Sequence, residues 1–225
     1  MPPKNLDKML LVEGIADKGL FEQICIFLGL EKDIIFLPKD LTTYRNTKEG
    51  VFHTLPHILQ QRGGDKDLKL AVIIDADYIR HGKGYSKALE RFKQEIEEYG
   101  YHLKNGDDEI GLIFENEEGF SDLGLWIMPN NQDEGMLEDW IKCCISKEEY
   151  DLFQQASDTV KNLSNQRFSE HSRTKAEVAT WLAWQKKPGE GLYATMIENK
   201  EGERLLDIQH PLFQALARWL EHIFK

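Results

Sequence analysis

The sequence predicts an α/β fold with a mainly parallel sheet flanked by helices. Short apolar segments alternate with amphipathic helical patterns over the first hundred residues, which is typical of a doubly wound layer. The segment Leu68–Ile74 is apolar on both faces, as expected of a strand inside a parallel sheet. A helical pattern over Tyr85–Tyr99 follows it, with Leu89, Phe92 and Ile96 on one face.

The elements of this first part are predicted from apolar periodicity and from breaker residues. Gly29 fits a helix C-cap, and Pro56 is expected to break or restart the helix that contains it. In chain order we expect a strand at 8–12, a helix at 16–28, a strand at 33–37, a helix between 46 and 62, a strand at 68–74 and a helix at 85–99.

The later elements suggest a second part of the chain. Apolar segments at 110–115 and 123–128 predict either a hairpin or one added parallel strand with an edge partner, before a helix that starts near Gly135. Helices are then expected near 147–163, 175–185 and 211–224, with Trp181, Trp184 and Trp219 packing on the sheet. We therefore divide the chain into an α/β core, residues 1–145, and an all-helical C-terminal extension, residues 146–225, packed on that core.

The composition gives the chain a strongly negative charge. Its 225 residues carry 28 Lys and Arg against 39 Asp and Glu, a net charge of -11. A protein that binds nucleic acid unaided usually has a basic face, and no long Lys/Arg run is present. Such a ligand would require either a local basic patch formed by the fold or a partner that brings the substrate.

Compartment is inferred from the cysteines and from apolar runs. There are three cysteines, Cys25, Cys143 and Cys144, and no C-x-x-C pair that would predict a zinc ribbon. An odd number with two adjacent cysteines favours a reducing compartment. The N-terminus lacks an apolar signal segment, and no apolar run approaches the roughly 20 residues of a membrane span. We expect a cytoplasmic protein without membrane contact.

Carboxylates follow two of the predicted strands. Glu13 comes directly after the first strand, and Asp75 and Asp77 end the third. In a parallel sheet both ends lie at the same edge, where ligands bind in open α/β sheets. Carboxylates gathered there repel each other unless a cation lies among them. Asp17, four residues after Glu13, is expected on the same side, although an acid in a first helical turn also stabilises the helix dipole.

Further candidates lie in the loops after these strands. Glu138 and Asp139 open a helix at the same predicted edge, and one of them could complete a second metal site; ordinary first-turn acids are the alternative. The loop from Arg80 to Gly84 could offer Arg80 and Lys83 to a phosphate, although a basic, glycine-rich surface turn is also common.

The carboxylate pattern resembles a known domain. Val12-Glu13-Gly14-x-x-Asp17, followed by a strand ending in Asp75-x-Asp77, resembles the Toprim domain of topoisomerases, primases and OLD-type nucleases over roughly residues 8–140. The resemblance implies a Toprim-like fold, general acid/base chemistry and metal binding for Glu13, and Mg²⁺ coordination by Asp75 and Asp77. Asp17 matches a further acid that OLD-like members often have.

Other segments extend the resemblance over nearly the whole chain. They are similar to small stand-alone OLD-nuclease-like Toprim proteins, from which a fold but no activity is carried over. The segments are Trp126-Ile127-Met128-Pro129-x-Asn131, Gly135-Met136-Leu137-Glu138-Asp139, Trp181-Leu182-Ala183-Trp184-Gln185 and Trp219-Leu220.

Together these observations predict a Mg²⁺- or Mn²⁺-dependent nuclease that cleaves phosphodiesters. The resemblance implies a role in anti-phage defence, and a separate ABC-type ATPase as partner, because the sequence has no G-x-x-x-x-G-K-[ST] loop. Two alternatives remain: a non-catalytic, metal-binding interaction module, and a phosphohydrolase of small molecules. The oligomeric state is left open.

Overall fold

The computed structural model describes residues 8–30, 34–37, 47–61, 66–104, 111–199 and 202–225. Within them the chain forms one sheet in the order β2-β1-β3-β6-β5-β4. The first four of these strands run parallel, and β5 and β4 are antiparallel to their neighbours. The strands are β1 (Lys8–Leu11), β2 (Ile34–Leu37), β3 (Lys69–Asp75), β4 (Tyr101–Leu103), β5 (Leu112–Asn116) and β6 (Leu123–Met128).

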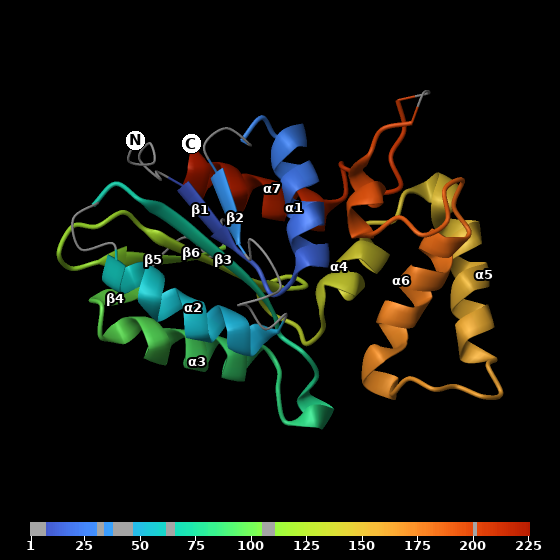
Figure 1. Cartoon of the computed structure of the whole chain (residues 1–225), viewed down its shortest axis with the longest axis horizontal. Helices are drawn as coiled ribbons and strands as arrows, with labels where there is room; N and C mark the ends of the chain where they lie inside the picture. The colour runs from blue at the N-terminus through green and yellow to red at the C-terminus, as the bar shows by residue number, and fades with distance from the viewer. Residues whose placement is uncertain (1–7, 31–33, 38–46, 62–65, 105–110, 200–201) are drawn as a thin grey trace.

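Helices cover both faces of this sheet, so the predicted α/β class with a mainly parallel sheet is confirmed (Figure 1). Helices α1 and α7 pack on one face, and α2 and α3 on the other. Helix α4 follows β6, and α5 and α6 lie side by side at one end of the molecule. The helices are α1 (Ile15–Phe27), α2 (Lys48–Gln61), α3 (Tyr85–Glu97), α4 (Leu137–Cys143), α5 (Tyr150–Lys161), α6 (Arg173–Ala183) and α7 (Pro211–Phe224).

Two details of the α/β part differ from the predictions. The helix α2 continues through Pro56, and the predicted break is wrong. One lost backbone hydrogen bond is tolerated because the helix buries an apolar face that includes Val51, Phe52 and Leu55. The hairpin alternative holds for β5 and β6, while the edge strand β4 was not predicted.

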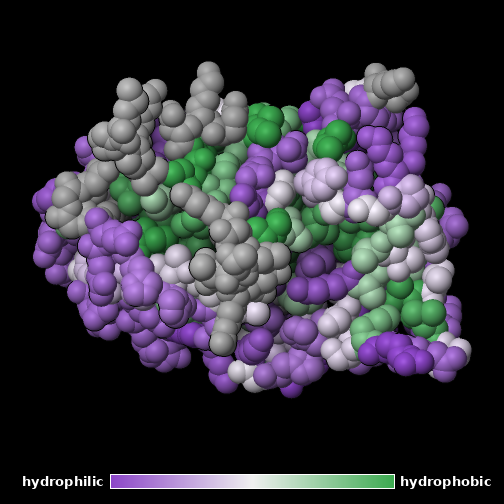
Figure 2. Space-filling model, viewed as in Figure 1, coloured by the Kyte–Doolittle hydropathy of each residue, from purple (hydrophilic) through white to green (hydrophobic). Residues whose placement is uncertain are grey.

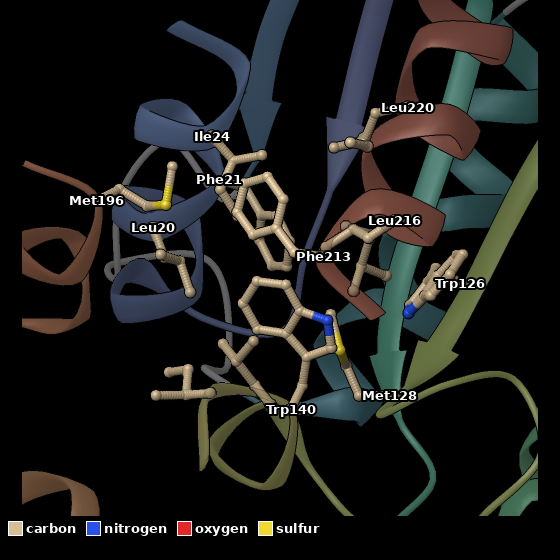
Figure 3. Close-up of a cluster of buried hydrophobic side chains, with 14 of the residues drawn as sticks. Leu20, Phe21, Ile24, Trp126, Met128, Trp140, Met196, Phe213, Leu216 and Leu220 are labelled. Carbon is tan, nitrogen blue, oxygen red and sulfur yellow. The ribbon is translucent and has the colours of Figure 1, made fainter. Parts of the chain in front are cut away.

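The face of the sheet under α1 and α7 carries the larger aromatic core. Side chains from α1, α4, α7 and β6 meet there (Figure 3). The Trp126 and Trp219 ring centroids are 5.6 Å apart, and Trp140 stacks on Phe213 at 5.8 Å. Helix α7 can approach β6 closely because Gly124 has no side chain: a Cβ there would lie 2.8 Å from Ile223. This close approach anchors the end of the chain on the sheet.

The C-terminal extension is therefore built from two different parts. Helix α7 belongs to the sheet layer, whereas α5 and α6 pack on each other and on α4. Trp219 packs on the sheet as predicted, against Trp126 of β6. Trp181 is also fully buried, but its ring lies 5.7 Å from that of Phe153 on α5 and not on the sheet. Trp184, which follows the end of α6, is 43% exposed, so its predicted packing is wrong. Within the described residues, every helix is too short or too polar to cross a membrane.

Candidate functional site

The carboxyl ends of β1 and β3 bring Glu13 and Asp75 together. The Glu13 carboxylate accepts a hydrogen bond from the backbone N–H of Asp75 at 2.8 Å. The Asp75 carboxylate accepts one from the N–H of Leu137, the first residue of α4, at 2.9 Å. Each acid therefore also fixes the end of a neighbouring element. Glutamine and asparagine would keep these acceptor oxygens, so charge and structure can be tested separately at both positions.

Asp77 faces different surroundings from Asp75. In a regular strand both side chains would point to one face, with Ala76 on the other, and Ala76 is fully buried. The backbone of Asp77, however, has a left-handed conformation, with φ of 59°, and it exchanges two hydrogen bonds with the backbone of Gly135. Its carboxylate lies 3.3 Å from Lys83 and is hydrogen-bonded to Lys48. Burial alone would raise the Asp77 pKa, but the bond from Lys48 and the two lysine charges lower it.

All three acids line one cavity of about 620 Å³. Its lining also includes Lys175, Glu49 and four further cationic side chains. The loop between β3 and α3 forms part of the wall. Gly84 holds this loop, because its N–H bonds to Ala76 O at 3.0 Å, its φ is +112°, and a Cβ would lie 2.8 Å from Ile79. We name the cations the cation wall: Lys48, Lys83, Lys87 and Arg91.

Two of the cavity acids interact with two further carboxylates, Asp17 and Glu138, which are not among the residues that line the cavity. We call the group the acid cluster: Glu13, Asp17, Asp75 and Glu138. Burial raises the pKa of each of the four. The charges of Glu13, Asp17 and Glu138 raise the Asp75 pKa further. Lys175 lowers the pKa of all four acids, and its own pKa is raised by them despite its burial. The acid cluster is therefore under-compensated by positive charge.

This electrostatic imbalance predicts a pH-dependent stability. Burial, with the charges of Glu13 and Glu138, raises the pKa of Asp17 to about 7, from an ordinary value of 3.8. The folded state then binds a proton at Asp17 more tightly than the unfolded state does. The contribution of this proton to the free energy of unfolding is therefore fully present below pH 3.8 and is lost as the pH rises through about 7. Titrating alone, Asp17 would account for about 4 kcal/mol.

We expect the melting temperature of the metal-free protein to fall between pH 5 and pH 8, measured by calorimetry. Asp17→Asn, which removes the titrating group, should flatten this profile, and the exposed Asp133→Asn should leave it unchanged. A wild-type profile that is flat or rises over this window would contradict the imbalance.

The acid cluster offers the oxygen donors that Mg²⁺ and Mn²⁺ prefer. A cation could bind one of these oxygens without displacing a hydrogen-bond donor, because Oε2 of Glu138 is buried and accepts no hydrogen bond from the residues that the structure describes. Among those residues, no three His, Cys, Asp or Glu side chains form a ready-made ligand group. The chemistry of the donors fits a divalent cation, and coordination would require the side chains to rearrange.

Asp139 is engaged in structural bonds. Its carboxylate accepts hydrogen bonds from the N–H of Met136 at 2.8 Å, the Tyr78 hydroxyl at 2.6 Å and the Thr174 hydroxyl at 3.0 Å. It thus caps α4 and ties together the β3–α3 loop and the start of α6. Glu138, whose Oε1 lies 3.9 Å from Lys175, is the member of the predicted Glu138 and Asp139 pair that joins the acid cluster.

The two predicted phosphate contacts also separate. Lys83 lines the cavity, whereas the cavity lining among the described residues does not include Arg80. The Arg80 guanidinium instead lies over the Tyr78 ring, 5.1 Å from its centroid, and donates to Glu170 O at 3.3 Å. Arg80 therefore connects the loop to the segment before α6.

Several cavity residues were not predicted from the sequence. Lys87 and Arg91 lie four apart in the expected helix 85–99, and this spacing is a signal that could have found them. Lys48, at the start of α2, has no such signal. His171, whose Nε2 lies 3.5 Å from Asp77, and Lys175 reach the cavity from α6 and the turn before it. Their contribution depends on how α6 is oriented, which no local pattern reveals.

Fold and site together define an α/β protein whose charged side chains gather beyond the carboxyl ends of parallel strands. More particularly, residues 7–225 match the family DUF3226, described as "Protein of unknown function", and the chain belongs to this family. Comparison with curated proteins and with solved structures gave no significant match.

Proposed function

We propose that this protein is a Mg²⁺- or Mn²⁺-dependent nuclease that hydrolyses phosphodiester bonds in nucleic acid. The observation that carries the proposal is the cavity whose lining brings Glu13 and Asp75 together with the residues of the cation wall. Carboxylates beside a phosphate-binding surface are the donor set that metal-dependent phosphoryl chemistry needs. The Toprim resemblance implies the same roles for Glu13 and Asp75. It also implies metal coordination by Asp77, whose carboxylate pairs with Lys48 and Lys83 in this structure.

The residues would have distinct roles in the reaction. Asp75 and Glu138, with Glu13, would hold the cation, which when bound would supply Lewis-acid stabilisation of the phosphate charge. Glu13 lines the cavity and has a raised pKa, so it is suited to accept a proton from an attacking water. Lys48 and Lys83, now paired with Asp77, would bind the phosphate oxygens and orient the scissile bond.

Substitution of Glu13 tests this function. Wild-type protein incubated with end-labelled single-stranded DNA and RNA should cleave them in Mg²⁺ or Mn²⁺ and not in EDTA. Glu13→Gln should lose at least about 10³-fold in rate, equivalent to ~4 kcal/mol of transition-state stabilisation, while keeping the acceptor for the Asp75 N–H. Glu90→Gln, on the exposed face of α3, is the matched control and should cleave normally.

Cleavage that survives in Glu13→Gln at wild-type rate would overturn the role of the site. Circular dichroism of both variants separates a catalytic loss from a folding defect, because the isosteric amide should leave the spectrum unchanged.

The size of the cavity supports a second candidate. A volume of about 620 Å³ lies within the usual range of about 300–1,000 Å³ for small-molecule pockets. A phosphohydrolase of small phosphate esters would use the same acids and cations. Turnover of a nucleotide or an aryl phosphate without cleavage of any polynucleotide would favour this function over a nuclease.

The proposal includes a partner protein in anti-phage defence. A net charge of -11 opposes the long-range attraction of nucleic acid. A separate ABC-type ATPase, which the Toprim resemblance implies as a partner, would hold the substrate or control its access to the site. An ATPase gene beside this one, and co-purification of the two products, would support the association.

A further inference from the structure

Three cations on α3 or just before it line the cavity. Lys83 immediately precedes Gly84, the N-cap of α3, and Lys87 and Arg91 follow at intervals of four residues. Four residues advance a helix by about 6 Å and return to nearly the same face. Lys87 and Arg91 therefore lie on nearly the same face of α3, about 6 Å apart along its axis, a spacing comparable with that of neighbouring phosphates in an extended strand, and Lys83 lies in the loop just before the helix.

The end members of this series are held in position by other residues. Arg91 donates two hydrogen bonds to the Glu49 carboxylate, at 2.5 and 2.7 Å, and its guanidinium lies 4.0 Å from the Phe52 ring centroid. Lys83 is held beside Asp77 by the two glycines that flank it, Gly82 and Gly84, both with positive φ. The arrangement fixes the series at both ends before any ligand binds.

Lys87, between them, is the member with a free charge. Its ammonium donates to the carbonyl of Gly82 at 2.8 Å and forms no ion pair with the residues that the structure describes. The side chain is exposed, and the surface over α2 and α3 is mostly hydrophilic (Figure 2). An exposed, uncompensated ammonium beside two positioned cations is a suitable contact for a phosphate oxygen.

We propose that Lys83, Lys87 and Arg91 form a track for the backbone of a single polynucleotide strand, which we call the phosphate track. The cavity volume of about 620 Å³ matches a ligand of nucleotide size, so we assign an unpaired strand and not a duplex to this site. The track also provides the local basic patch that the overall charge of -11 requires. This inference rests on the proposed nuclease function and deepens it by naming the form of the substrate.

Binding in EDTA tests the track separately from catalysis. Fluorescence anisotropy with labelled oligo(dT) and oligo(U) should give tighter binding than a duplex of equal length. Lys87→Gln should weaken binding about 3–10-fold and reduce the slope of log K against log salt by about 0.7 between about 50 and 200 mM salt. Lys93→Gln is the matched control, because Lys93 is an exposed lysine on the same helix outside the cavity lining.

The outcomes separate the two proposals. Equal effects of Lys87→Gln and Lys93→Gln, or no binding by the wild type at low salt, would overturn the track. Duplex binding as tight as single-strand binding would overturn the single-strand assignment. If Lys87→Gln binds oligonucleotides as tightly as the wild type and the wild type still cleaves them, the track alone is contradicted. If the wild type binds single strands as expected but does not cleave them in Mg²⁺ or Mn²⁺, the nuclease is contradicted and the track is supported.

Discussion

Asp75→Asn is expected to abolish cleavage and, at the same time, to stabilise the metal-free protein. Asp75 accepts the Leu137 N–H that begins α4, and asparagine keeps that acceptor. Burial, followed by the charges of Glu13 and Asp17, raises the Asp75 pKa well above its usual value, so the ionised form costs free energy in the fold. The neutral amide removes this cost.

We expect a gain of about 1–2 kcal/mol at pH 8, raising the melting temperature in EDTA by roughly 2–8 °C. Cleavage in Mg²⁺ should fall by at least about 10³-fold, and stabilisation by added Mg²⁺ should disappear, because a cation that binds only the native state stabilises it in proportion to its affinity. Asp122→Asn, whose carboxylate is exposed and pairs with Lys104, should change stability by less than about 0.5 kcal/mol. A destabilised Asp75→Asn that still responds to Mg²⁺ would contradict both expectations.

Lys175→Gln should have the opposite effect on stability. Lys175 lowers the pKa of every member of the acid cluster, so its removal leaves those carboxylates facing one another without this compensation. About half of the lysine side chain is exposed, and solvent screens part of its effect. We therefore expect a loss of about 1–2 kcal/mol at pH 8 in EDTA, seen as a melting temperature lower by roughly 2–8 °C.

Two comparisons make this result specific. Lys142→Gln removes a lysine of similar exposure that pairs with one carboxylate, Glu177, at 3.0 Å, and its effect should be smaller. Lowering the pH to 5 should diminish the loss in Lys175→Gln, because the acid cluster takes up protons. A loss that is equal at pH 5 and pH 8 would mean that Lys175 acts through packing and not through its charge.

Much of the α/β layer could be predicted because its signals are local. The buried strand 68–74, the helix after it and the helix 211–224 follow from apolar periodicity, and the structure has β3, α3 and α7 at these positions. The strand β4 could not be predicted, because three residues with an exposed His102 at the centre are too short to show a pattern. The break predicted at Pro56 is absent, because burial of the apolar face of α2 outweighs the hydrogen bond that the proline removes.

Only the carboxylates at the strand ends of the candidate site could be predicted from the sequence. Glu13, Asp75 and Asp77 follow strands, and strand ends in a parallel sheet share one edge, so their meeting at one cavity was inferable. The left-handed backbone of Asp77, which turns its carboxylate to Lys48 and Lys83, has no signal in a non-glycine residue. Nor could the contribution of His171 and Lys175 be seen, because it depends on the packing of α6 against α4.

The position of α7 over β6 has a consequence for how the protein is made. The helix follows all the strands in the chain and leaves the ribosome after them, and yet it covers a face of the central sheet, with Trp219 against Trp126. Lys175 and His171 also emerge late, after the strands that carry Glu13 and Asp75. A nascent chain would thus contain Glu13 and Asp75 before Lys175 is made and before α7 can cover the sheet, so the cavity can be completed only after α6 and α7 have emerged.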